Sequence, residues 1–272
     1  ILDYTEINNN IRDNFFDQKI KWTGVKDIKI VDKYLYISLT KKVKKNCYNT
    51  SLYKAVLNKS YLNFIKVFEP DECFDLNRNI QAFRYFNGYQ TGGRIEHDNE
   101  NIYLSLGDYN YWKEPQDLNS FAGKIIALKK SNNKITLISL GHRNPQGMLY
   151  LKDKNSLIIT EHGPKGGDEI NLIKLIDNKV SNYGWPISSY GNHYDVVPIN
   201  NYTKKYAPLY KIHSSYGFEE PIKYFKESIG ISQIMKNYQK KNVYFVTSLK
   251  DSSIYEIEFD ENFFFRRILN RL

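Results

Sequence analysis

The feature that most constrains the fold is a short β-rich segment, ended by a polar turn, that recurs along the chain. Its four clearest copies are residues 34–39 (YLYISL), 102–106 (IYLSL), 157–160 (LIIT) and 243–247 (VYFVT). Their β-branched and aromatic side chains are typical of strands. The copies begin 68, 55 and 86 residues apart, which is too long for one hairpin but suits a repeated sheet with insertions. The pattern predicts an all-β protein.

Further strand candidates lie at 123–128, 134–139, 169–176 and 253–259. Residues 51–68 are the one stretch long enough to consider as a helix, and their Tyr, Val, Ile and Phe content argues against it. Many short strands favour a sandwich, barrel or propeller, and the weak repeat favours the propeller. A large β-sandwich with coincidental likeness among its strands stays open as the alternative.

Composition excludes several classes of protein. The chain has 272 residues, of which 41% are hydrophobic and 25% charged, as in globular proteins. It contains no apolar run of the roughly 18 residues that a membrane helix needs, so we expect no membrane span. The net charge of +9 includes a lysine run at 41–45, which we interpret as a solvated face rather than a nucleic-acid surface. The chain begins with Ile1, so we expect a signal peptide or longer segment to precede it.

The two cysteines, Cys47 and Cys73, lie 26 residues apart. In a cytosolic enzyme such a pair is usually two thiols, whereas in an exported protein it is more often a disulfide. Spacing leaves both interpretations open. A bridge would contribute roughly 3 to 4 kcal/mol by loop closure and would fit a periplasmic or secreted protein.

The most distinctive segment runs from 141 to 195 and contains GHRNPQGM, TEHGPKGGDEINLI and NYGWPISSYGNHYD. Arg143 and Asn144 place a cation and hydrogen-bond donors directly before a proline, which suits a rigid loop that holds an anion. The following Gly-Pro-x-Gly-Gly turn and its two carboxylates offer the oxygen ligands that Ca²⁺ prefers. A tight turn and a packed aromatic corner are the alternative interpretation of the same residues.

Together these motifs resemble the soluble glucose/sorbosone dehydrogenase family, the pyrroloquinoline-quinone (PQQ) dependent aldose sugar dehydrogenases. Further matches are GGRI with LSLGD at 92–108, QDLNSFAGKI at 116–125, PIKYFKESIGIS at 221–232 and YFVTSLKDSSIYEI at 244–257. The resemblance implies a six-bladed β-propeller with PQQ on its top face. It also implies that the anomeric hydroxyl of a sugar is oxidised to give a lactone.

The resemblance also assigns roles to residues. Arg143 and Asn144 would contact PQQ, Lys250 would meet the cofactor and Arg271 would meet one of its carboxylates, for which an arginine fork is suited. The carbonyls of Gly163 and Pro164 would ligate the Ca²⁺ that touches PQQ. Glu169 and Tyr183, with the backbone near 189–195, would form a second, structural Ca²⁺ site.

Two departures from the family bear on this assignment. The family's catalytic base is a His, and here that position is Gln90 in YQTGGRI. Gln can orient a hydroxyl but cannot accept its proton near neutral pH, so general-base catalysis of roughly 10²- to 10⁴-fold would be lost. The family's first strand segment and the second Arg of its last motif are also absent. We therefore expect residues 1–272 to be a single propeller domain and a fragment, with parts of its first and last blades missing.

The sequence thus predicts a periplasmic or secreted PQQ- and calcium-dependent oxidoreductase acting on a small sugar, with its catalysis in question at Gln90. The alternative is a non-catalytic, calcium-stabilised propeller that binds a sugar, a glycan or a protein. The particular sugar, the electron acceptor and the oligomeric state stay open.

Overall fold

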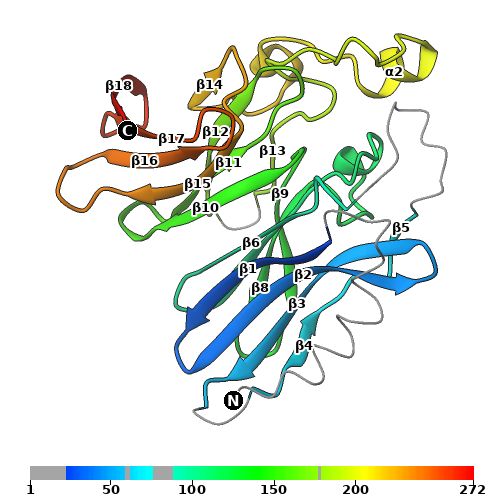
Figure 1. The fold of residues 1–272 in the computed structure, drawn as a ribbon, viewed down its shortest axis with the longest axis vertical. Coiled ribbons are helices and arrows are strands. Elements are labelled where there is room, and N and C mark those ends of the chain that lie inside the picture. The colour runs from blue at the N-terminus through cyan, green and yellow to red at the C-terminus, as the bar shows by residue number, and fades with distance from the viewer. Residues whose placement is uncertain (1–22, 59–61, 76–87, 177–178) are drawn as a thin grey trace.

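The computed structural model describes residues 23–58, 62–75, 88–176 and 179–272 (Figure 1). Within these ranges the regular structure is nearly all β-strand, arranged in four sheets. The one α-helix of the described residues is the short α2 (Asn201–Tyr206). None of the helices in these ranges has the length and apolar character to cross a membrane. The prediction of an all-β chain is confirmed.

Each sheet is built mainly from strands that follow one another in the chain and pair antiparallel. The first sheet contains β1 (Gly24–Val31), β2 (Tyr34–Lys44), β3 (Cys47–Val56), β4 (Ile65–Phe68) and the two-residue β5 (Phe74–Asp75). The second contains β6 (Gly92–His97), β7 (Asn101–Leu106), β8 (Lys124–Lys129), β9 (Ile135–Leu140) and the parallel β13 (Ser181–Asn182).

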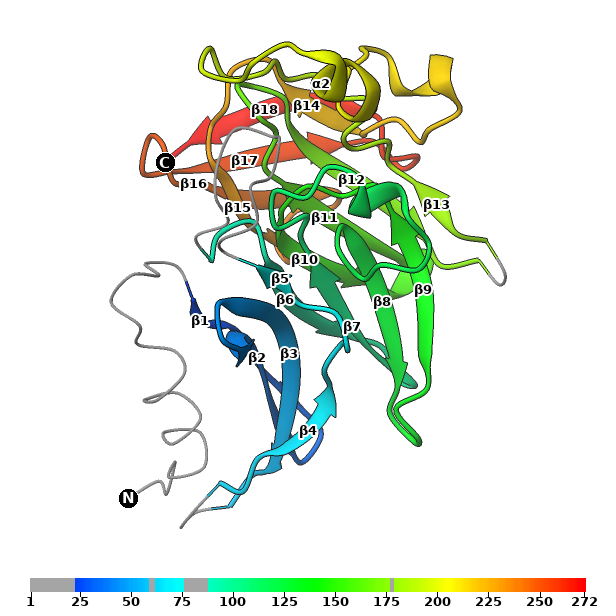
Figure 2. The ribbon, with the colours of Figure 1, turned by 90° about the vertical axis from the view of Figure 1, so that its right-hand side faces the viewer.

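The third sheet contains β10 (Pro145–Leu151), β11 (Ser156–Glu161), β12 (Asp168–Lys174) and β14 (Lys223–Phe225). The fourth contains β15 (Ile231–Lys236), β16 (Val243–Ser248), β17 (Ser253–Phe259) and β18 (Phe265–Arg271). Figures 1 and 2 show the sheets following one another from the blue first sheet to the red last one.

The first strand of every sheet packs against the first strand of its neighbour. β1 contacts β6, β6 contacts β10, and β10 contacts β15. Sheets that meet through their first strands in this way are the blades of a β-propeller. The described residues therefore form four consecutive blades, and the propeller fold expected from the sequence is confirmed.

The recurring sequence segment is the second strand of each blade, in β2, β7, β11 and β16. This strand has a partner strand on both edges, and the neighbouring blades cover its faces. Leu104 of β7 and Ile158 of β11 are accordingly fully buried, which explains why this strand has the strongest apolar signal of its blade. The described part of 51–68 falls in β3 and β4 and is not helical, as its composition indicated; residues 59–61 lie outside the described residues.

The hydrophobic core is divided into layers between successive blades. Leu52 and Leu104 belong to the layer between the first two blades, Ile125 and Ile159 to the next, and Ile158 and Ile257 to the last. Each fully buried side chain of this size contributes about 1.5 to 3 kcal/mol. The layers hold the blades in fixed relation and so fix the loops at their ends.

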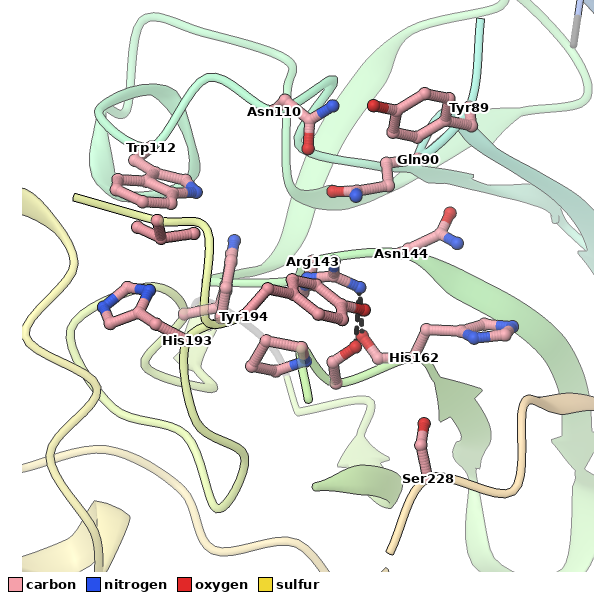
Figure 3. A pocket seen from close by; sticks show the side chains of 14 residues that line it. Tyr89, Gln90, Asn110, Trp112, Arg143, Asn144, His162, His193, Tyr194 and Ser228 are labelled. Atoms are coloured by element: carbon pink, nitrogen blue, oxygen red, sulfur yellow. Dashed lines mark hydrogen bonds between the residues drawn. The ribbon is translucent and has the colours of Figure 1, made fainter. Parts of the chain in front are cut away.

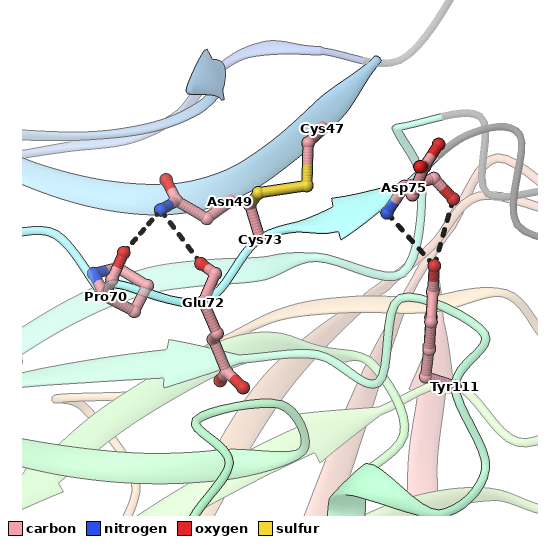
Figure 4. Close-up of a disulfide and its surroundings, with 7 residues drawn as sticks. All are labelled: Cys47, Asn49, Pro70, Glu72, Cys73, Asp75 and Tyr111. Carbon is pink, nitrogen blue, oxygen red and sulfur yellow. Dashed lines mark hydrogen bonds between the residues drawn. A yellow bond between two sulfur atoms is a disulfide. The ribbon is translucent and has the colours of Figure 1, made fainter. Parts of the chain in front are cut away.

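Cys47 and Cys73 form a disulfide, with their Cα atoms 5.4 Å apart (Figure 4). The bridge ties the start of β3 to the segment before β5. Beside it, Asn49 donates from Nδ2 to the carbonyls of Pro70 at 2.9 Å and Glu72 at 3.3 Å. Of the two interpretations of this cysteine pair, the structure supports the disulfide.

Candidate functional site

Loops from one end of the blades converge on a pocket of about 270 Å³ (Figure 3). Gln90 lies just before β6, Arg143 and Asn144 join β9 to β10, and Gly163 and Pro164 join β11 to β12. All five line the pocket, although up to 74 residues separate them in the chain. The structure therefore brings together five of the residues singled out in the sequence.

Arg143 forms the base of the pocket and is only 7% exposed. Its Nη1 donates to the carbonyls of Gly163 at 2.7 Å and His162 at 3.1 Å, and its guanidinium lies 5.3 Å from the Trp185 ring. The Nε–H is buried and makes no hydrogen bond. A buried donor without a partner is costly, and one on a fixed cation is suited to receiving an anionic oxygen.

Gln90 is held at both ends of its amide. Oriented to satisfy its neighbours, it donates from Nε2 to Asp108 Oδ1 at 2.7 Å and accepts from Arg143 Nη2 at 3.0 Å. Its backbone lies in the left-handed region, with φ of 57°, which is uncommon for a residue other than glycine. Gln90 thus bridges a buried carboxylate and a buried cation, and neither amide atom can act as a base.

Asp108 was not assigned a role from the sequence, although it ends the LSLGD motif. It is fully buried and accepts hydrogen bonds from Trp185 Nε1 at 2.8 Å and the Asn110 backbone N–H at 2.9 Å. Burial raises the pKa of Asp108 to about 6, with Arg143 and these two donors opposing the shift. At neutral pH the carboxylate is therefore mostly ionised, directly behind Gln90.

Aromatic side chains form the opposite wall, where Figure 3 shows Trp112 and His193 close together. Trp112, Trp185, His193 and Tyr194 all line the pocket, and His193 donates from Nε2 to the Ala207 carbonyl at 2.8 Å. Flat rings of this kind can stack on a planar cofactor or a sugar. His193 received no function from the sequence, and its place within the distinctive 141–195 segment was the one signal that pointed to it.

Lys250 and Arg271 do not line the pocket. Lys250 is exposed, and its backbone N–H donates to the Ile229 carbonyl at 3.1 Å, next to Ser228 at the pocket wall. Arg271 lies on β18, where its Nη2 pairs with Asp251 at 2.6 Å. The structure thus places Lys250 near the rim and leaves Arg271 tied to a carboxylate of its own blade.

Glu169 and Tyr183 lie beside the pocket, around a second cavity of about 10 Å³, which has room for about one water. Burial and the nearby Glu161 raise the pKa of Glu169 well above its ordinary value. Glu161 is also buried, but His142 at 3.1 Å and the Arg143 backbone N–H at 2.9 Å hold its pKa below the usual range. The surroundings therefore favour the charged form of Glu161 and the protonated form of Glu169.

The protein is a propeller whose blade loops build a pocket suited to an anionic ligand. Comparison with known proteins identifies the family to which it belongs. The profile of the Glucose / Sorbosone dehydrogenase family matches residues 21–270, so the chain belongs to this family. Aldose sugar dehydrogenase YliI of Escherichia coli (strain K12) is 33% identical over 186 residues, which are 61% of this chain and 47% of that protein. Quinoprotein glucose dehydrogenase B of Acinetobacter calcoaceticus is 30% identical over 128 residues, covering 36% of this chain and 26% of that protein. The matches thus span less than half the length of these relatives.

Solved structures agree with the fold. The apo-form of the soluble aldose sugar dehydrogenase from Escherichia coli superposes with a TM-score of 0.74 at 24% identity, covering 92% of this chain and 73% of that one. The PQQ-bound aldose sugar dehydrogenase from Streptomyces coelicolor superposes with a TM-score of 0.59 at 18% identity, covering 85% and 60%. At these identities the likeness establishes the propeller and nothing finer.

Proposed function

We propose that the pocket binds PQQ together with an aldose sugar, and that the protein oxidises the anomeric hydroxyl of the sugar to give a lactone. Membership of the family and the PQQ-bound relative support the reaction class. The observation that carries the proposal is the buried Arg143 guanidinium, whose Nε has no partner, at the base of an aromatic-walled pocket.

The residues present fit such a cofactor. PQQ is planar and carries three carboxylates, so it needs flat walls and cationic donors. Trp112 and Trp185 supply the walls, and Arg143 and Asn144 supply donors. We propose Lys250 as a further cation at the rim and Arg271 as a more distant one, which would have to leave Asp251. When bound, the quinone accepts a hydride from the sugar.

At Gln90 the proton of the sugar hydroxyl meets an amide and not a base. Gln90 can orient the hydroxyl, but both ends of its amide are already engaged by Asp108 and Arg143. Asp108 is a carboxylate of suitable pKa, about 6, yet it lies behind Gln90 and is fully buried. We therefore propose turnover slower by roughly the 10²- to 10⁴-fold that a positioned general base supplies.

Calcium at Gly163 and Pro164 is proposed only together with the quinone. The two carbonyls are far fewer than the six to eight oxygen ligands that Ca²⁺ takes, and the Gly163 carbonyl already accepts from Arg143 at 2.7 Å. The oxygens of PQQ would have to complete the set. Calcium binding in the pocket should therefore depend on the cofactor.

The disulfide supports a compartment that is oxidising. We propose that the protein acts in the periplasm or outside the cell, where the Cys47–Cys73 bridge is stable.

The second candidate is a non-catalytic propeller that binds a sugar, a glycan or a protein at the same pocket. The observation that favours it is the amide of Gln90, locked between Asp108 and Arg143 at the position where the family has its base. Fold alone does not distinguish the two functions.

A titration with PQQ, with and without CaCl₂, tests the proposal through the thermal midpoint, followed by dye reduction with a mixture of aldoses. A hundredfold excess over the dissociation constant should stabilise the protein by about 2.7 kcal/mol. Arg143→Met should abolish this stabilisation, whereas Arg267→Met, which removes an exposed arginine that pairs with Glu258 at 2.8 Å, serves as the matched control. Stabilisation by PQQ without dye reduction would show that the protein binds the cofactor but does not oxidise these aldoses. If PQQ does not stabilise the wild-type protein, the quinoprotein proposal fails.

A further inference from the structure

The backbone expected to hold the structural calcium ion is bound by side chains of this chain instead. Lys211 donates from Nζ to the carbonyl of Ser189 at 2.9 Å and also to that of Gly191. Both carbonyls belong to the loop at residues 188–192, which lies within or beside the stretch that the family resemblance assigned to calcium. The ammonium thus takes up two carbonyl oxygens that a calcium ion in this stretch would need as ligands.

His213 contacts the other two expected ligands. Its Nδ1 donates to the Tyr183 carbonyl at 3.0 Å, and its Nε2, which makes no hydrogen bond, lies 3.5 Å from Glu169 Oε1. His213 is 1% exposed, so this contact is shielded from water. Lys211 and His213, two residues apart, thus contact four oxygen-bearing residues of the expected calcium site: Tyr183, Glu169, Ser189 and Gly191.

The residues therefore do not fit a calcium ion at Glu169 and Tyr183. We propose that Lys211 and His213 replace it, so that the 188–192 loop is held by an internal ammonium and an imidazole and is independent of calcium. This inference does not rest on the quinone, because none of these contacts involves the pocket lining that would hold it.

The 188–192 loop supports the pocket from behind. Lys165 and Asn192 exchange two backbone hydrogen bonds of 2.9 Å, and a Cβ atom at Gly191 would come within 2.8 Å of the Pro164 ring. Pro164 lines the pocket. Anchoring the 188–192 loop therefore also anchors the Gly163–Pro164 turn. The hydrogen bonds of Lys211 thus help to hold the pocket lining in place.

Thermal unfolding of the whole chain without PQQ tests the proposal, with each protein measured in EDTA and in excess CaCl₂. The wild-type midpoint should be the same in both. Lys211→Met should lower it by roughly 2–4 °C, as expected in a domain of this size when charge-assisted hydrogen bonds are lost. Lys165→Met is the matched control: its Nζ pairs with the exposed Asp195 at 2.7 Å, so its removal should change the midpoint little.

Either of two results overturns the inference. One is a wild-type midpoint that rises in CaCl₂ and falls in EDTA, which would show that calcium displaces the lysine. The other is a Lys211→Met protein as stable as Lys165→Met, which would show that the ammonium does not hold the loop. Because the unfolding measurements contain no quinone, neither result depends on whether the protein oxidises sugars.

Discussion

Replacing Asp108 by Asn should remove a specific part of the pH dependence of stability. Asp108 is fully buried, and burial raises its pKa from 3.8 to about 6. Between these two values the folded protein binds more protons than the unfolded chain, so stability falls as pH rises through this window. The difference of 2.2 pKa units corresponds to about 3 kcal/mol, at 1.36 kcal/mol per unit. The wild-type protein should lose this amount between about pH 4 and pH 7, and Asp108→Asn should not.

Urea unfolding at several pH values measures the effect as the difference between wild type and variant. Asn also changes the hydrogen bonds to Trp185 and Gln90, but that cost is nearly independent of pH and cancels when the differences at two pH values are subtracted. Asp153→Asn, which removes a carboxylate that is 84% exposed, is the control. A wild-type-minus-variant difference that stays flat from pH 4 to pH 7 would refute a buried Asp108 carboxylate with a raised pKa.

Three further predictions concern the same region and the disulfide. Arg143→Met should raise the pKa of Asp108 above about 6, because Arg143 is the first of the influences that oppose burial; the pH window of the unfolding difference should move upward. Gln90→His should increase dye reduction by roughly 10²- to 10⁴-fold over wild type in the PQQ-loaded protein, and no increase would argue for the binding propeller. Replacing Cys47 and Cys73 by Ser should lower the free energy of unfolding by about 3.5 kcal/mol, from the 26-residue separation, and reduction of the wild type should match it.

Much of the fold could be predicted from the sequence because its signal is local. The second strand of a blade has a neighbour on every side, so it must be apolar on both faces, and this requirement repeats in β2, β7, β11 and β16. Arg143 and Asn144 could be identified for the same reason, as could Gly163 and Pro164. Each pair lies in one short motif, and the chemistry of that motif can be recognised without the rest of the chain. The Tyr, Val, Ile and Phe content of residues 51–68 argued against a helix, and the described part of this stretch indeed pairs as β3 and β4.

The tertiary structure alone decided which distant residues meet. Asp108 reaches Gln90, Lys211 reaches the 188–192 loop, and the two cysteines form a bond that their spacing left open. Lys250 and Arg271, which motifs had assigned to the cofactor, lie outside the pocket lining. These outcomes depend on how loops from separate blades pack together, and that packing is set by the core layers between blades. A contact of this kind joins residues from distant parts of the chain, so no local sequence pattern predicts it.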